Sequence, residues 1–74
     1  MSRVDARILC EMCNADSPQT ADIIRFVNQK PSATKVRDWY DLLPIQYLAM
    51  NKNIGLSELK RIMKEAPAIK AEFE

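Results

Sequence analysis

The chain has 74 residues, of which 47 % are hydrophobic and 28 % are charged, a composition typical of one small folded domain and not of a disordered segment. Its single glycine argues against a strand-and-turn architecture, in which glycine supplies left-handed turn positions. Eleven basic and ten acidic residues leave a net charge of +1. Domains held on DNA mainly by phosphate contacts usually carry a larger basic excess, so this balance counts mildly against such a partner.

Apolar residues recur at helical spacing along the chain, and no segment alternates long enough to form a strand. We therefore predict a single all-α domain over residues 1–74, a compact orthogonal bundle of five to six short helices with room for a helix-turn-helix. No apolar run approaches the roughly 18 residues that span a bilayer. Charges also interrupt the apolar segment at the amino terminus, which is atypical of a secretory signal. We expect a soluble, cytoplasmic protein with no membrane partner.

The first predicted helix is capped by Ser2 and runs to about Cys13. The second starts at Ser17, because a serine cap followed by a proline at the first helical position is a strong start signal. It ends at about residue 28 or 29. Pro31 then breaks the chain, since proline disfavours helical backbone in the residue before it.

Ser32 caps a third predicted helix over residues 33–42, and Pro44 ends it. Its apolar residues recur at i, i+3, i+4 and i+7, namely Val36, Trp39, Tyr40 and Leu43. Trp39 is the only tryptophan, and its ring can bury more apolar area than any neighbouring side chain. We expect Trp39 at the centre of the core.

Three more helices are predicted after residue 43. The fourth opens at Pro44 and frays over residues 51–53, and Gly55 completes the break. The fifth is capped by Ser57. A last short helix after Pro67 is expected to dock through Ile69 and Phe73.

Nothing in the sequence indicates catalysis. The chain has no histidine to act as a base near neutral pH, and a single glycine cannot build a phosphate-binding loop. The acidic residues are scattered singly, as helix caps or solvated helix faces. We expect a protein that is not an enzyme and uses no cofactor.

Cys10 and Cys13 form a CxxC pair, the sharpest local motif in the chain. A structural zinc site needs four ligands, and the chain has neither a histidine nor a third cysteine. The pair lies near the end of a predicted helix, where the helix dipole does not favour a thiolate. We predict two small core residues; metal binding is the weaker alternative.

The break at Pro31 joins two predicted helices in the manner of a helix-turn-helix, whose second helix enters the major groove of DNA. The segment SATKVRDWYDLL resembles the second helix of many small phage and plasmid regulators. Side chains of this pair that would donate to phosphates and base edges are Arg25, Lys30, Ser32, Thr34, Lys35 and Arg37. A small regulator that binds double-stranded DNA is therefore the first predicted function, and a homodimer would suit it, because paired half-sites give specificity.

A second register over residues 45–64 also fits the pattern of small repressors at several positions. It would place Lys60, Arg61 and Lys64 toward DNA. The alternative function is a protein-interaction module, an adaptor or inhibitor that docks another protein through an exposed apolar face. Phe26, Tyr47 and Met50 would supply that face, because aromatic residues and methionine are enriched in interface cores.

Overall fold

The computed structural model describes residues 3–71. It confirms the all-α fold, and residues 3–71 contain no strand. The elements in chain order are α1 (Arg3–Cys13), α2 (Thr20–Gln29), the 3-10 helix η1 (Pro31–Lys35), α3 (Pro44–Met50), α4 (Leu56–Glu65) and α5 (Pro67–Ala71). The predicted cap Ser2 and the predicted docking residue Phe73 lie outside the described residues.

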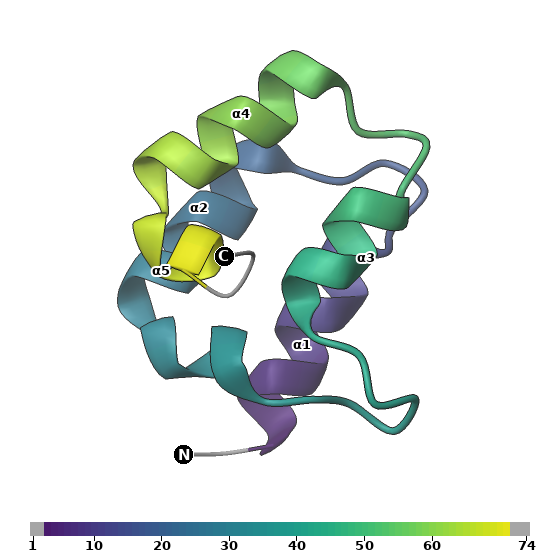
Figure 1. Cartoon of the computed structure of the whole chain (residues 1–74), viewed down its shortest axis with the longest axis vertical. Coiled ribbons are helices and arrows are strands. Elements are labelled where there is room, and N and C mark those ends of the chain that lie inside the picture. Colours follow the sequence, from purple (N-terminus) through teal and green to yellow (C-terminus); the bar gives the residue numbers. More distant parts are fainter. Residues whose placement is uncertain (1–2, 72–74) are drawn as a thin grey trace.

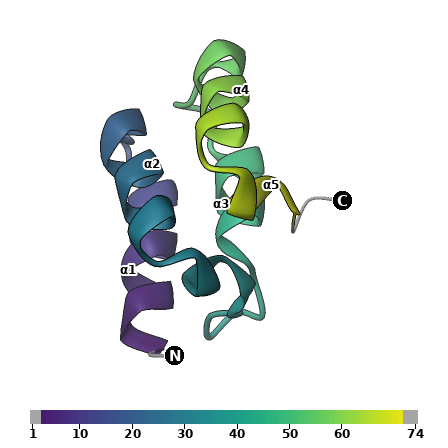
Figure 2. The same cartoon turned by 90° about the vertical axis from the view of Figure 1, so that its left-hand side faces the viewer.

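The helices form two layers. Helices α1 and α2 lie side by side in one layer, and α3, α4 and α5 make up the other, with η1 crossing between the layers at one end (Figure 2). In Figure 1, α3 runs along α1 on one side of the molecule, and α4 and α5 cover α2 on the other. None of the helices within residues 3–71 is long and apolar enough to cross a membrane.

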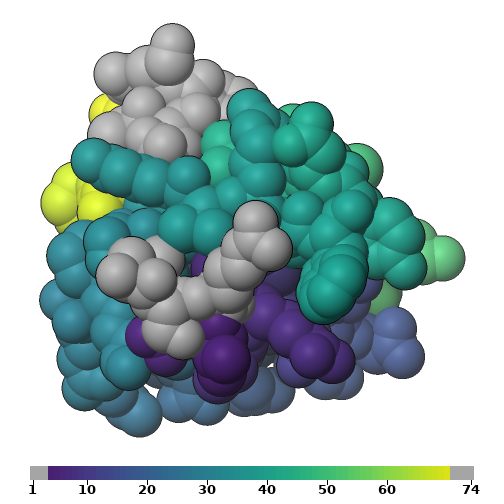
Figure 3. Space-filling model, turned by 90° about the horizontal axis from the view of Figure 1, so that it is seen from below, coloured from purple at the N-terminus to yellow at the C-terminus, as the bar shows by residue number. Residues whose placement is uncertain are grey.

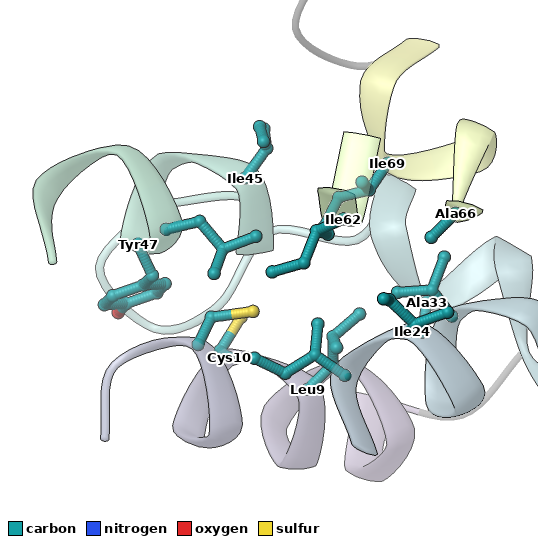
Figure 4. Packing of buried hydrophobic residues seen from close by; sticks show 13 residues of the cluster. Leu9, Cys10, Ile24, Ala33, Ile45, Tyr47, Ile62, Ala66 and Ile69 are labelled. Carbon is teal, nitrogen blue, oxygen red and sulfur yellow. The ribbon is translucent and has the colours of Figure 1, made fainter. Parts of the chain in front are cut away.

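The core fills the space between the two layers. Each of the helices α1 to α5 contributes one large, fully buried side chain to this core: Leu9, Ile23, Leu48, Ile62 and Ile69, in that order. Leu9 and Cys10 rise from α1 into the space that Ile62 enters from the opposite layer (Figure 4). Burial of such side chains is the main driving force for folding a chain of this size.

Asn51 connects the carboxyl end of α1 to the end of α3. Its Nδ2 donates to the carbonyl oxygens of Cys13 and Ala15, at 2.9 Å each. The last carbonyls of a helix have no partner within the helix, so a side-chain donor at this place satisfies groups that would otherwise be left unpaired. The predicted break at residues 51–53 is thus confirmed, and its asparagine also holds two helices together.

The predicted helix over residues 33–42 is wrong. The chain forms η1 only as far as Lys35, and Val36 is already extended, with φ −102° and ψ 127°. The side chain of Asp38 accepts hydrogen bonds from the backbone N–H groups of Tyr40 and Leu42. In a continuing helix these N–H groups would instead donate to backbone carbonyls of the preceding turn. Leu43 is extended because it precedes Pro44.

The prediction that Trp39 lies at the centre of the core is wrong for the same reason. Outside a helix, the i, i+3, i+4 spacing no longer directs Trp39 and Tyr40 to one buried face, and they are 86 % and 80 % exposed. Ala33 and Thr34, from the short η1 segment, are buried in their place. The hydroxyl of Thr34 donates to the carbonyl oxygen of Pro31 at 2.7 Å, so its burial leaves no polar atom unpaired.

Two predicted helix starts are displaced. Helix α2 starts at Thr20, with Gln19 in extended backbone as its N-cap. The N-cap thus lies two residues after Ser17, where it was predicted. Helix α4 starts at Leu56, with Gly55 in the cap position predicted for Ser57. Ile69 is fully buried, as expected.

Candidate functional site

Residues 36–43 form a structured turn that we name the aromatic turn, because it carries Trp39 and Tyr40. The backbone N–H of Asp41 donates to the carbonyl of Asp38 at 3.0 Å, and the Asp38 N–H donates to the carbonyl of Leu42 at 3.0 Å. Asp41 adopts a left-handed φ of 62°, which aspartate tolerates better than most residues. Arg37 Nη1 donates to the Asp41 carbonyl at 2.9 Å. Hydrogen bonds therefore hold the exposed part of the turn, while Leu42 and Leu43 at its end pack against the core.

Asp38 is the centre of this turn. Its Oδ1 accepts the N–H of Tyr40 at 2.9 Å and that of Leu42 at 3.1 Å, and its Oδ2 accepts a hydrogen bond from the hydroxyl of Tyr47 on α3. Burial alone would raise the pKa of the Asp38 carboxyl, but these hydrogen bonds outweigh burial and hold the pKa below its ordinary value. Asp38 is thus ionised at neutral pH and anchors the turn to α3.

A cleft of about 450 Å³ lies between the aromatic turn and α1, and we name it the aromatic cleft. Helix α1 contributes Arg7, Cys10, Glu11 and Asn14 to its lining. The remaining lining residues are Asp38, Trp39 and Tyr40 from the turn and Tyr47 from α3. The volume falls within the roughly 300–1,000 Å³ of typical ligand sites.

Trp39 also lines a second, smaller hollow of about 90 Å³, together with Ala6 and Arg37. In the space-filling view, the teal side chains of the aromatic turn stand out from the surface near the purple residues of α1 (Figure 3). Trp39 therefore borders both hollows and is itself exposed.

The fixed charges of the aromatic cleft are those of Asp38, Glu11 and Arg7. Arg7 Nε pairs with Glu11 Oε1 at 3.2 Å, and these two charges cancel. The hydrogen bond to Asp38 raises the pKa of Tyr47 to about 12, so its hydroxyl stays neutral. The cleft consequently carries the net negative charge of Asp38, next to the rings of Trp39, Tyr40 and Tyr47.

Cys10 and Cys13 are buried free thiols. Burial, reinforced by the charges of Asp38 and Glu11, raises the pKa of Cys10 to about 11, and burial followed by the proximity of Cys10 raises the pKa of Cys13. Both therefore stay protonated, which disfavours nucleophilic and metal-binding roles. Within residues 3–71, no three cysteine or acidic side chains gather where they could hold a metal ion.

The residues of the first predicted DNA-binding register do not share one helix face. Thr34, predicted as an exposed donor, is buried, because η1 packs it beneath α5. Three of the basic side chains form ion pairs: Arg25 with Asp22, Lys30 with Asp5 and Arg37 with Asp41. Ser32 and Lys35 remain exposed on η1. Without a helix over residues 33–42, this segment offers no helix to place in a groove.

The second register corresponds to α3, the loop after it and α4. Lys60, Arg61 and Lys64 are exposed, and Arg61 pairs with Glu65 at 2.8 Å. Helix α3 packs chiefly on α1, whereas α4 packs on α2 and α5. In a helix-turn-helix the two helices are joined by a tight turn of about three to four residues, so α3 and α4 differ from that arrangement.

The three residues predicted for a protein-binding face are dispersed. Phe26 is half-buried against the core, and Tyr47 is 9 % exposed because its hydroxyl bonds Asp38. Only Met50 is largely exposed, at 61 %. Within residues 3–71, the exposed aromatic residues are instead Trp39 and Tyr40.

Sequence reasoning missed the aromatic turn because it followed the helical spacing of apolar residues. The signal that could have located it is the run Asp38-Trp39-Tyr40-Asp41 shortly before Pro44. Aspartates at both ends of a short segment favour a turn, and the proline limits any helix that enters it. No family model, no curated protein and no solved structure matches this chain.

Proposed function

We propose that this chain is a small protein-interaction module that docks a partner protein on the aromatic turn. The observation that carries the proposal is the exposure of Trp39 and Tyr40, at 86 % and 80 %, on a turn fixed by hydrogen bonds. Tryptophan and tyrosine are enriched among the few residues that dominate binding energy at protein interfaces. Large apolar groups held in water by a rigid turn favour docking, because little conformational entropy is lost when the partner covers them.

The proposal moves the binding surface predicted from the sequence to a different place. Of the residues expected to form that surface, Phe26 packs against the core. Tyr47 belongs to the core and donates a hydrogen bond to Asp38. DNA binding through Lys60 and Lys64 on α4 is the competing function. It ranks lower because the net charge is only +1 and the remaining basic residue of that register, Arg61, is paired with Glu65.

The test is capture of partners from cells of the source organism with three tagged forms of the chain. These are the wild type, the variant Trp39→Ala/Tyr40→Ala and the matched control Met50→Ala/Leu56→Ala, which also removes two large exposed apolar side chains. We expect at least one protein that the wild type and the control retain and the first variant loses, measured by quantitative mass spectrometry.

Identical captured proteins for all three forms would contradict the proposal. Anisotropy of a labelled mixed-sequence duplex, titrated at low and at physiological salt, tests the competing function in parallel. Salt-sensitive duplex binding that survives Trp39→Ala/Tyr40→Ala and is lost in Lys60→Ala/Lys64→Ala would replace the proposal with DNA binding.

A further inference from the structure

We infer that the aromatic cleft receives a lysine side chain of the partner protein, with its ammonium group between the carboxylate of Asp38 and the rings of Trp39 and Tyr40. This inference rests on the proposed function and specifies the chemistry of the partner.

The charge of the cleft selects a cation. Asp38 is ionised at neutral pH and lies half-buried, and the Arg7 charge is matched by Glu11 at 3.2 Å. Cys10 and Tyr47, which also line the cleft, remain uncharged at neutral pH. An anionic ligand would meet the uncompensated carboxylate of Asp38, whereas a cation would neutralise it.

The rings of the cleft suit the same ligand. A cation over the face of tryptophan or tyrosine is attracted by the ring quadrupole, most strongly for tryptophan. Trp39 and Tyr40 line the cleft from the turn, and Tyr47 lines it from α3. Because Trp39 and Tyr40 are exposed in the free protein, a bound cation with its aliphatic stem would also cover apolar surface.

The hydrogen bonds of Asp38 favour an ammonium over a guanidinium. A carboxylate offers about four lone-pair positions. Oδ1 already accepts two backbone N–H groups, whereas Oδ2 accepts the Tyr47 hydroxyl and is the oxygen that a further donor would approach. Arginine pairs best with carboxylates through two parallel hydrogen bonds, one to each oxygen, and Oδ1 has no position left for the second. A compact lysine ammonium needs only one.

The cleft is lined by the exposed Trp39 and Tyr40, so it can be reached from the surface. Glu11 lines the same cleft from α1. Its Oε2 accepts no hydrogen bond from the described residues, and its Oε1 is held by an exposed arginine. Glu11 is therefore the second acidic group that we expect to contribute.

The experiment is a titration of the full chain with three blocked amino acids, namely the N-acetyl methylamides of lysine, arginine and glutamine. The readout is the single indole N–H resonance of Trp39, together with the backbone amides of residues 36–43, in ¹H–¹⁵N spectra. Blocked lysine should produce a saturable shift with a Kd of about 1–30 mM, as expected for one charge and one ring contact. Blocked arginine and glutamine should bind at least about fivefold more weakly.

Variants identify the site. Asp38→Asn keeps an Oδ1 acceptor for the turn and removes the charge, so the affinity for blocked lysine should fall about fivefold or more. Glu11→Gln should weaken it by about twofold, because Glu11 is exposed and screened. The matched control is Glu65→Gln, since Glu65 also pairs with an arginine four residues earlier, at 2.8 Å, on a helix outside the cleft. It should leave the affinity unchanged.

The inference is overturned by no saturable shift up to about 100 mM of blocked lysine, a concentration far above the affinity expected. Equal binding of blocked glutamine or arginine would overturn it as well. If Asp38→Asn does not fold, the comparison of Glu11→Gln with Glu65→Gln decides. Should blocked lysine fail while partner capture still depends on Trp39 and Tyr40, the interaction module stands and only its ligand chemistry is wrong. If blocked lysine binds at the cleft but the captured proteins are the same for every variant, the lysine site stands and the proposed interaction module is wrong.

Discussion

The core and the aromatic turn use their large side chains in opposite ways. Leu9, Ile62 and their neighbours are fully buried between the two helical layers, where apolar contact holds the fold together. In the aromatic turn the largest side chain of the chain, Trp39, is 86 % exposed, and the backbone is held by hydrogen bonds around Asp38. The difference teaches that the size and hydrophobicity of a residue do not decide its burial when local hydrogen bonds set the backbone.

The largest expected effect tests the core side of this comparison. Leu48→Ala should lower the free energy of unfolding by about 2–5 kcal/mol, because it removes a fully buried side chain and leaves a cavity. Urea unfolding followed by circular dichroism measures the change. Leu56→Ala, at a position 68 % exposed, is the control and should change it by less than about 0.5 kcal/mol. Equal effects at the two positions would contradict the described core.

The second effect tests the hydrogen bonds of the turn. Asp38→Ala removes the acceptor of two backbone N–H groups and of the Tyr47 hydroxyl. The expected loss is about 1–2 kcal/mol in the same unfolding measurement, since Asp38 is half-buried and its bonds are charge-assisted. Asp41→Ala is a suitable comparison, because its carboxylate makes only a long, exposed ion pair with Arg37 at 3.8 Å. A loss no larger for Asp38 than for Asp41 would show that the turn does not depend on Asp38.

The third effect concerns pH at the contact between the turn and the core. The hydrogen bond to Asp38 raises the pKa of Tyr47 from 10.0 to about 12, so folding favours the protonated phenol. Its contribution to stability is full below pH 10 and is lost as the pH rises from 10 to 12. Wild-type protein should therefore lose more stability over this interval than Tyr47→Phe does, in urea unfolding at a series of pH values. Parallel pH profiles for the two proteins would contradict the contact.

At the acid end the sign is reversed. The pKa of Asp38 is below its ordinary 3.8, so its contribution is present above that pH and is lost as the pH falls through the lower value of the folded protein. Asp38→Asn should make the free energy of unfolding depend less on pH in this acid range. It should also reduce the loss of stability in the alkaline range, because the hydrogen bond to Tyr47 is weakened at the same time.

The accuracy of the predictions made from the sequence differs in the same way between the core and the aromatic turn. Where apolar spacing and a proline agreed, as in α3 after Pro44 and α5 after Pro67, the helices and the burial of Ile69 were predicted correctly. Core packing decides those segments, and packing leaves a periodic trace in the sequence. The single all-α fold could be predicted for that reason.

The candidate site could not be predicted in the same way. Between Pro31 and Pro44 the apolar spacing indicated a helix, but Asp38 binds the backbone N–H groups of Tyr40 and Leu42 and stops it. The position of the Asp38 carboxylate is supported by the hydroxyl of Tyr47, which donates to it from α3, nine residues further along the chain. A contact of this kind leaves no periodic trace, so the exposed Trp39 was assigned to the core.

The smallest expected effect tests the exposed side of the comparison. Trp39→Ala should change the free energy of unfolding by no more than about 0.5 kcal/mol, although it removes the largest side chain in the protein. Chemical unfolding monitored by circular dichroism gives the value without using the tryptophan signal. A loss of about 3 kcal/mol or more would be the signature of a buried aromatic residue and would place Trp39 in the core.

The most direct measurement is acrylamide quenching of tryptophan fluorescence, because Trp39 is the only tryptophan and reports on the turn alone. We predict that the folded protein has an emission maximum and a quenching constant close to those of the same protein in concentrated urea and of N-acetyltryptophanamide. A blue-shifted emission that resists quenching until the protein unfolds would contradict the exposed aromatic turn, and with it the binding surface proposed for this protein.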